Sequence, residues 1–275
     1  MSISNFIPTI WSECLKTALD QQYVGVANCN REYEGEITEK GSVVKICGVG
    51  DIAIGSYVKD TNMNLPQDLS DTVVELPINQ ARYFNFQVDD VDRAQCSPKL
   101  MDAAMKVAAA GLSREADRAV FQLYRDHSNI LSLDNAGSYN IINFLIDARQ
   151  SLYEAGVFDQ NEVVLEVSPA VASILYKAEL DKLSSNNDLM EHGCIGSIAG
   201  CKVFVSNNIA LEDNHHMCFM RTKRAIAFAE QISEVEAYRP ERRFADALKG
   251  LHLFGTAVVY PEELVVLSIQ PDPNY

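Results

Sequence analysis

The residues best suited to bind a metal ion lie in one stretch of the 275-residue chain. Cysteine and histidine are the ligands that hold zinc in a tetrahedral site, and residues 192–218 contain His192, Cys194, Cys201, His215, His216 and Cys218. Their spacing argues against such a site, because there is no C-x-x-C pair and Cys201 begins an alternating, strand-like segment. We therefore expect cysteines that pack in the core and histidines in loops. A zinc-binding domain or enzyme that uses this window remains the alternative.

A second candidate is the acidic cluster Asp89, Asp90 and Asp92. Carboxylates can bind a cation, but these precede a long predicted helix, whose N-terminal end favours negative charge. No second carboxylate cluster can be placed beside them. The glycines of residues 48–55 lack the dinucleotide-binding spacing, and the sequence contains no GxxxxGK[ST], GxSxG or HExxH motif. The sequence therefore predicts neither an enzyme nor a bound cofactor.

The charge balance argues against tight binding of nucleic acid. The formal net charge is −15, from 23 basic and 38 acidic residues, whereas a surface that neutralises phosphates needs an excess of Lys and Arg. The one dense basic spot in the sequence is Arg239, Arg242 and Arg243. We expect it either to contact an acidic patch on another copy or to be solvated. This composition is compatible with enclosing nucleic acid without binding it tightly.

Apolar runs and cysteines indicate the compartment in which the protein is found. No apolar run approaches the ~18 residues that span a membrane, and the N-terminus has no signal-peptide pattern. Seven cysteines, an odd number, are scattered along the chain, which suits a reducing compartment better than a disulfide framework. We therefore expect no membrane partner.

Hydrophobic periodicity predicts an α+β chain. Apolar spacing of three and four predicts helices at 8–21, 97–125, 140–155 and 168–183. Period-two alternation predicts a β excursion over 31–90 and strands at 162–167, 202–206, 217–221, 232–238, 251–260 and 264–270. The polar, glycine-bearing residues 184–200 are predicted to be a loop.

The excursion and the helix that follows it are both unusually long. Ser97 and Pro98 provide an N-cap and a first-turn proline, and the periodic pattern continues to Arg125, so the helix has ~28 residues and a length of ~42 Å. The sixty residues before it alternate without any helix to cover them. Such an excursion must either fold back on its own body or lie on another molecule.

The order of these segments resembles that of a known family. FIPTIWSECLKTAL, NREYEGEITEKGSVVKI and LPINQARYFNFQVDDVDRAQ, followed by a long helix, resemble the major capsid proteins of tailed bacteriophages, which have the Hong Kong 97-like fold. IGSIAGCKVFVSNNI and FGTAVVYPEELVVL are similar to the peripheral strands of that family. The resemblance covers about residues 6–267.

The resemblance implies a domain organisation. Its parts are an N-terminal arm and helix at 1–30, an extended β loop at 31–90, a peripheral domain with a spine helix at 91–130, an axial domain at 131–238, and strands that return to the peripheral domain at 239–275. The extended loop would lie on a neighbouring subunit and have no partner within its own chain. The residues expected at contacts between subunits are Tyr33, Lys45, Tyr57, Arg239, Arg242 and Arg243.

The resemblance also implies a function. The chain would assemble as pentamers and hexamers of an icosahedral shell that encloses a double-stranded DNA genome without specific binding. Its partners would be other copies of itself, a scaffolding protein and a portal. It would be a component of the virion, assembled in the host cytoplasm. An encapsulin-like shell of the same fold, which stores protein cargo, is the alternative.

Overall fold

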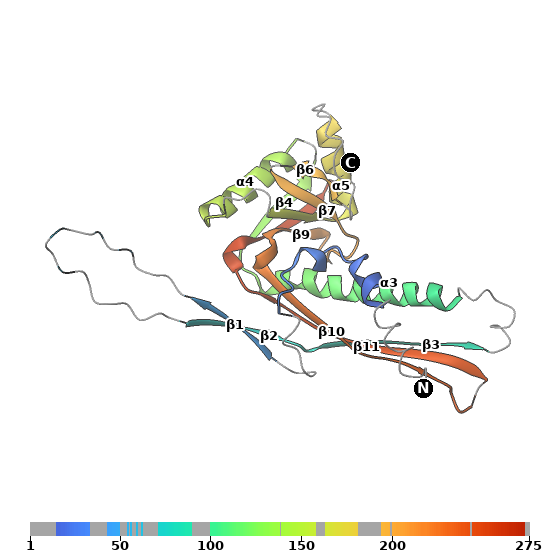
Figure 1. The fold of residues 1–275 in the computed structure, drawn as a ribbon. Coiled ribbons are helices and arrows are strands. Elements are labelled where there is room, and N and C mark those ends of the chain that lie inside the picture. Colours follow the sequence, from blue (N-terminus) through green and yellow to red (C-terminus); the bar gives the residue numbers. More distant parts are fainter. Residues whose placement is uncertain are drawn as a thin grey trace.

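The structure is a computed structural model, and the statements below concern the residues that it describes: 15–33, 43–49, 54, 56, 59, 62, 71–89, 100–137, 139–157, 163–180, 194–198, 200–242 and 244–272. Two sheets and a hairpin organise these residues (Figure 1). A long three-stranded sheet lies beneath a body built on a seven-stranded sheet. A two-stranded hairpin extends past one end of the long sheet.

The long sheet is antiparallel and carries the longest helix on one face. Its strand order is β10 (Ile226–Tyr238), β11 (Ala245–Val258) and β3 (Gln80–Asp89). Helix α3 (Leu100–Phe121) and the 3-10 turn η4 (Gln122–Asp126) run along it (Figure 1).

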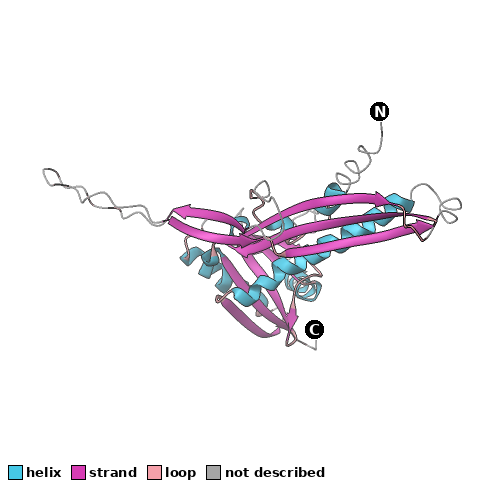
Figure 2. Ribbon diagram, turned by 90° about the horizontal axis from the view of Figure 1, so that it is seen from below, coloured by secondary structure: helices cyan, strands magenta, loops and turns pink. Residues whose placement is uncertain are grey.

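Alternation explains how this sheet packs, because successive strand side chains point to opposite faces. Phe228 and Phe254 belong to the main core together with Ala109 and Ala116 of α3. These two alanines are fully buried, and their small side chains let the helix approach the sheet closely. On the opposite face of the long sheet no helix lies among the described residues, as Figure 2 shows from below.

The second sheet mixes parallel and antiparallel pairs. Its strands, in spatial order, are β4 (Ile130–Ala136), β12 (Leu264–Pro271), β9 (His215–Thr222), β5 (Val163–Val167), β7 (Cys201–Val205) and β6 (Cys194–Ile198), and β8 (Leu211–Glu212) pairs with β9. Helices α4 (Ile141–Glu154) and α5 (Pro169–Leu180) pack on it. Every residue of β5 is buried, so both of its faces are covered.

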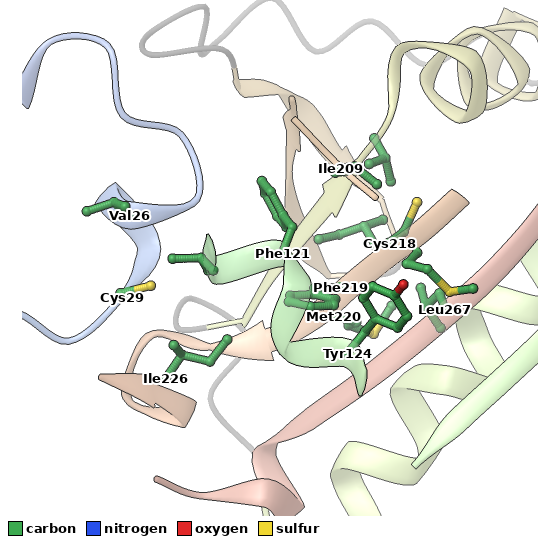
Figure 3. Close-up of a cluster of buried hydrophobic side chains, with 14 of the residues drawn as sticks. Val26, Cys29, Phe121, Tyr124, Ile209, Cys218, Phe219, Met220, Ile226 and Leu267 are labelled. Carbon is green, nitrogen blue, oxygen red and sulfur yellow. The ribbon is translucent and has the colours of Figure 1, made fainter. Parts of the chain in front are cut away.

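The main core lies where the end of α3 meets the seven-stranded sheet (Figure 3). Phe121 and Phe219 are fully buried and meet edge to face, with ring centroids 5.6 Å apart. Val26, at the start of the 3-10 turn η2 (Val26–Asn28), joins the same cluster from the N-terminal side. Two further 3-10 turns, η5 (Lys223–Ala225) and η6 (Pro261–Glu263), link strands of the two sheets.

The hairpin consists of β1 (Val43–Val49) and β2 (Asp71–Pro77), paired antiparallel. Its inner face packs against the long sheet in a second, smaller cluster. Val44, Ile46, Leu76 and Ile78 lie there with Ala227, Ala229 and Leu253. The cluster occupies the sheet face opposite α3, so the long sheet is buried on both sides at this end.

Most predicted elements are present, with differences at their ends. The first helix is seen over residues 15–20 and α3 over residues 100–121, because the preceding residues lie outside the described part. Gly156 has a positive φ of 90° and ends α4, as predicted. The predicted loop at 184–200 is wrong for its last part, because Cys194–Ile198 forms β6. Strand β4 was not predicted, although Leu131 and Leu133 alternate with Ser132 and Asp134.

One expectation about organisation is wrong. Residues 31–90 were expected to have no partner in their own chain, but β3 pairs along its whole length with β11. The strands of 239–275 belong to both sheets, because β11 lies in the long sheet and β12 lies between β4 and β9 in the seven-stranded sheet. The division of the chain into domains stays a prediction.

The contact of the hairpin with β11 depends on Gly255. A Cβ atom at this position would lie 2.3 Å from the backbone oxygen of Pro77 and 2.9 Å from Ile78 Cδ1. A backbone atom cannot turn aside as a side chain can, so we expect Gly255→Ala to lower the free energy of unfolding by about 1–3 kcal/mol. Urea unfolding of the unassembled chain measures this.

Gly111 is the matched control. A Cβ atom there meets nothing within 4 Å, so Gly111→Ala on α3 should raise stability by about 0.5–1 kcal/mol. If Gly255→Ala proves as stable as the parent, the hairpin does not lie against β11 as described.

Candidate assembly interface

The cysteines and histidines of residues 192–218 do not gather in the structure. Cys201 and Cys218 are fully buried in β7 and β9, and burial raises the pKa of their thiols to about 11 and about 12. His215 is the first residue of β9 and does not lie in a loop as expected; its Nε2 is 2.9 Å from Asp134 Oδ1. Among the described residues no three His, Cys, Asp or Glu side chains are placed to share a metal ion; His192 lies outside them.

The outer face of the β1–β2 hairpin is exposed among the described residues and carries valines beside a pair of charged residues. The register places Val43 opposite Pro77, Lys45 opposite Glu75, and Cys47 opposite Val73. Val43 is 46% exposed and Val73 48% exposed. In the described residues β1 pairs with β2 alone, so its outer edge presents backbone donors and acceptors. An open edge beside exposed apolar side chains is typical of a contact with another chain.

The predicted contact residues fall in two places. Tyr33 is half-buried and packs against the cluster under the hairpin, whereas Lys45 is exposed on the outer face of the hairpin. Arg239 and Arg242 are exposed in the turn between β10 and β11, at the other end of the long sheet (Figure 1). Tyr57 and Arg243 lie outside the described residues. Contact of any of them with another subunit stays a prediction.

Two aromatic residues were missed by the sequence reasoning. Phe244 is 81% exposed and follows the arginines in the β10–β11 turn. Tyr83 is 79% exposed on β3, beside a shallow hollow of about 300 Å³ that also contains Leu251. The side chains of Tyr83 and Phe84 point to opposite faces of β3, and Phe84 packs against the core. Tyr83 could have been identified, because an aromatic residue on the polar phase of a strand is unusual, whereas Phe244 lies in a turn and has no such signal.

Residues 23–31, called the N-terminal segment below, cross the junction of the two sheets. Backbone bonds join Asn30 to β10, from Asn30 N–H to Ile226 O (2.9 Å) and from Phe228 N–H to Asn30 O (2.9 Å). Three groups of buried charged side chains hold the rest of the segment.

The first group is the buried ion pair of Arg221 and Glu166, both fully buried. Arg221 Nε donates to Glu166 Oε2 (3.0 Å), and its Nη1 and Nη2 donate to the backbone oxygens of Asn28 (2.6 Å) and Gly25 (3.0 Å). Asn28 Nδ2 donates to Glu166 Oε1 (3.1 Å). Burial raises the pKa of Glu166, and the charge of Arg221 opposes this.

The second group is Asp117 of α3. Its Oδ1 accepts from Val26 N–H (3.0 Å), and its Oδ2 accepts from Val24 N–H (3.2 Å) and Asn208 Nδ2 (3.3 Å). Burial raises the pKa of this carboxyl to about 6 even though these hydrogen bonds lower it.

The third group is Glu230 of β10. Its carboxylate accepts from Tyr23 OH (2.5 Å), Arg31 Nη2 (2.6 Å) and His252 Nε2 (2.8 Å). Burial alone would raise the pKa of Glu230, but the bond to His252 and the charges around it lower it. Through these three groups the N-terminal segment ties α3, the seven-stranded sheet and the long sheet into one body.

Comparison with known proteins gives matches among solved structures. No family model matches the chain, and no curated protein matches it. A structure from Mycobacterium phage Che8 is 28% identical, covers 90% of this chain and 91% of that chain, and has a TM-score of 0.71. The capsid of Ralstonia phage GP4 is 10% identical, with coverages of 94% and 92% and a TM-score of 0.68. A virus-like particle from Pyrococcus furiosus is 14% identical, with coverages of 95% and 99% and a TM-score of 0.57.

These similarities, which extend over nearly the whole chain, define the class: the fold is that of the proteins that build phage capsids. The α+β fold predicted from the sequence is confirmed, and these structural similarities support the resemblance to the major capsid proteins of tailed phages that the order of the sequence segments indicated. The similarity to the Pyrococcus furiosus particle has the lower TM-score, so the encapsulin-like alternative is less well supported.

Proposed function

We propose that copies of this chain assemble as pentamers and hexamers into a closed shell that encloses double-stranded DNA. The observation that carries the proposal is the hairpin, with one apolar face buried on its own body and the other exposed. Similarity to phage capsids over most of the chain supports it. The role is structural, and we propose no catalytic activity.

In this shell the hairpin lies on a neighbouring subunit. Burial of Val43 and Val73 removes apolar surface from water, and the outer edge of β1 gains hydrogen-bond partners. The arginines and Phe244 of the β10–β11 turn provide a second contact, at the far end of the long sheet. Many repeated contacts of this kind stabilise a closed shell even if each one is weak.

The charge supports confinement of the genome without specific contacts. At −15 per copy, the subunit lacks the basic surface that releases counterions from DNA. A scaffolding protein and a portal complete the assembly, which takes place in the host cytoplasm. In the described residues no helix is both long and apolar enough to cross a membrane.

Charged substitutions on the outer face of the hairpin test the proposal. Val43→Asp and Val73→Asp change exposed side chains, so the stability of the unassembled subunit should change by less than about 0.5 kcal/mol. Shell formation should be lost, because a carboxylate would be buried at the contact. Sedimentation velocity and negative-stain microscopy measure shells, and urea unfolding measures the subunit.

Val73→Thr is the matched control, since it keeps the shape without adding a charge and should still assemble. Normal shells from both aspartate variants would contradict the role of the hairpin. The contents of shells made in cells separate the two kinds of shell: DNA supports a phage capsid, and a packed protein cargo supports the encapsulin-like alternative.

A further inference from the structure

Helix α4 buries an arginine without a counter-ion. Arg149 is 3% exposed and shares the buried face of α4 with Leu145, Ala148 and Leu152. In the part of the chain that the structure describes, its Nε, Nη1 and Nη2 atoms are all buried and have no hydrogen-bond partner. Arginine keeps its charge in proteins. A full cation with its donors unsatisfied is therefore enclosed in the subunit.

The surroundings of Arg149 do not compensate for its charge. The ring of Tyr153, one turn further along α4, lies over the guanidinium with its centroid 4.4 Å from Cζ. The charge of Arg149 also acts on the buried thiol of Cys201: burial raises the pKa of this thiol to about 11, and the charge of Arg149 lowers it only in part. A cation–π contact recovers much less free energy than the loss of hydration of an ion costs.

Arg221, the other buried arginine of the described residues, has partners that compensate for its charge. Arg221 has a carboxylate and two backbone oxygens as partners. The contrast indicates that the described residues do not provide the anion that Arg149 requires. Tyr153 is only half-buried, so a single aromatic ring separates the guanidinium from solvent on this side of α4.

We propose that Arg149 is a binding site for an oxyanion, a carboxylate or phosphate group supplied by another molecule, which reaches the edge of the guanidinium beside the ring of Tyr153 that lies over its face. Two oxygens of such a group match the paired N–H donors of the guanidinium. The chain has 38 acidic and 23 basic residues, so a carboxylate of a second copy is one source of the oxyanion. Inorganic phosphate is the other. The guanidinium belongs to the single subunit, so binding of inorganic phosphate can be measured without shell formation.

Thermal unfolding of the unassembled full-length chain tests the site. We compare the parent, Arg149→Met and Arg149→Lys in chloride, acetate and inorganic phosphate at equal ionic strength. In chloride the Tm of Arg149→Met should exceed that of the parent, because an apolar side chain of similar length replaces an unpaired buried charge. Arg149→Lys should remain as unstable as the parent or become less stable. Arg118→Met, at an exposed arginine on α3, controls for a general effect of removing a positive charge.

The anion dependence identifies the source. A rise in Tm with phosphate or acetate in the parent, absent in Arg149→Met, supports a site open to free oxyanions. No response to either salt, combined with at least tenfold weaker association of Arg149→Met subunits in sedimentation, supports a carboxylate of a second copy. If Arg149→Met has a lower Tm than the parent, an unchanged anion response and normal association, Arg149 has a structural role and the proposal is overturned.

Discussion

Replacement of Arg221 by methionine is expected to lower the free energy of unfolding of the unassembled subunit by about 3–5 kcal/mol. The change leaves Glu166 fully buried without its counter-ion, because both side chains have no exposed area. It also removes the donors that bind the backbone oxygens of Gly25 and Asn28, so the N-terminal segment loses its attachment to β9. Urea unfolding followed by tryptophan fluorescence and circular dichroism measures the loss.

Two further variants show whether the loss arises in the buried pair. Arg221→Met combined with Glu166→Leu removes both charges and should recover part of the stability, because no uncompensated ion remains. Arg118→Met breaks an exposed pair with Glu115 and should cost less than about 1 kcal/mol. A loss below about 1 kcal/mol for Arg221→Met would mean that the segment is not held as described.

The second large effect is a pH dependence that comes from Asp117. Its pKa is raised by burial from 3.8 to about 6, so the folded chain holds the proton more tightly than the unfolded chain does. The stabilisation from this group is fully present below the ordinary pKa and is lost as the pH rises through about 6. The difference between the two pKa values corresponds to about 3 kcal/mol.

Asp117→Asn removes this titration and nearly preserves the shape of the side chain. The stability of the parent minus that of the variant should therefore fall by up to about 3 kcal/mol between about pH 4 and pH 7. Glu166 and Glu230 titrate in both proteins, so subtracting the two curves largely removes their contributions. Urea unfolding at a series of pH values gives the curves. Parallel curves for the two proteins would show that the carboxyl of Asp117 is not perturbed.

Both effects concern the N-terminal segment, which bears on assembly. The segment joins the two sheets through Asp117, Arg221 and Glu230, and the chain reaches the hairpin shortly after it. A hairpin that is to contact a neighbouring subunit keeps a fixed orientation relative to its own subunit only if the residues from which it extends are held rigidly. The buried charges therefore stabilise the base from which the hairpin extends.

The sequence by itself determined the local elements and, through their order, the class of protein. Apolar spacing placed the buried face of α3, including Met105, Leu112 and Ala116, because the helical period brings these side chains to one side. Gly156 marked the end of α4, since a positive φ of 90° favours glycine. The exposed Arg239 and Arg242 could be located because charge clusters rarely lie in a core.

The tertiary structure alone decided which strands pair and which charges are buried. Alternation in β3 indicated a strand, but a period of two carries no information about its partner, which is β11, more than 150 residues away. Likewise Arg221 and Asn28, 193 residues apart, meet only in the folded chain. Arg149 reads as an ordinary polar position in a helix, and its burial without a partner follows from packing against the sheet. Local patterns reflect forces between residues a few positions apart, whereas pairing and desolvation depend on contacts that exist only after the whole chain has folded.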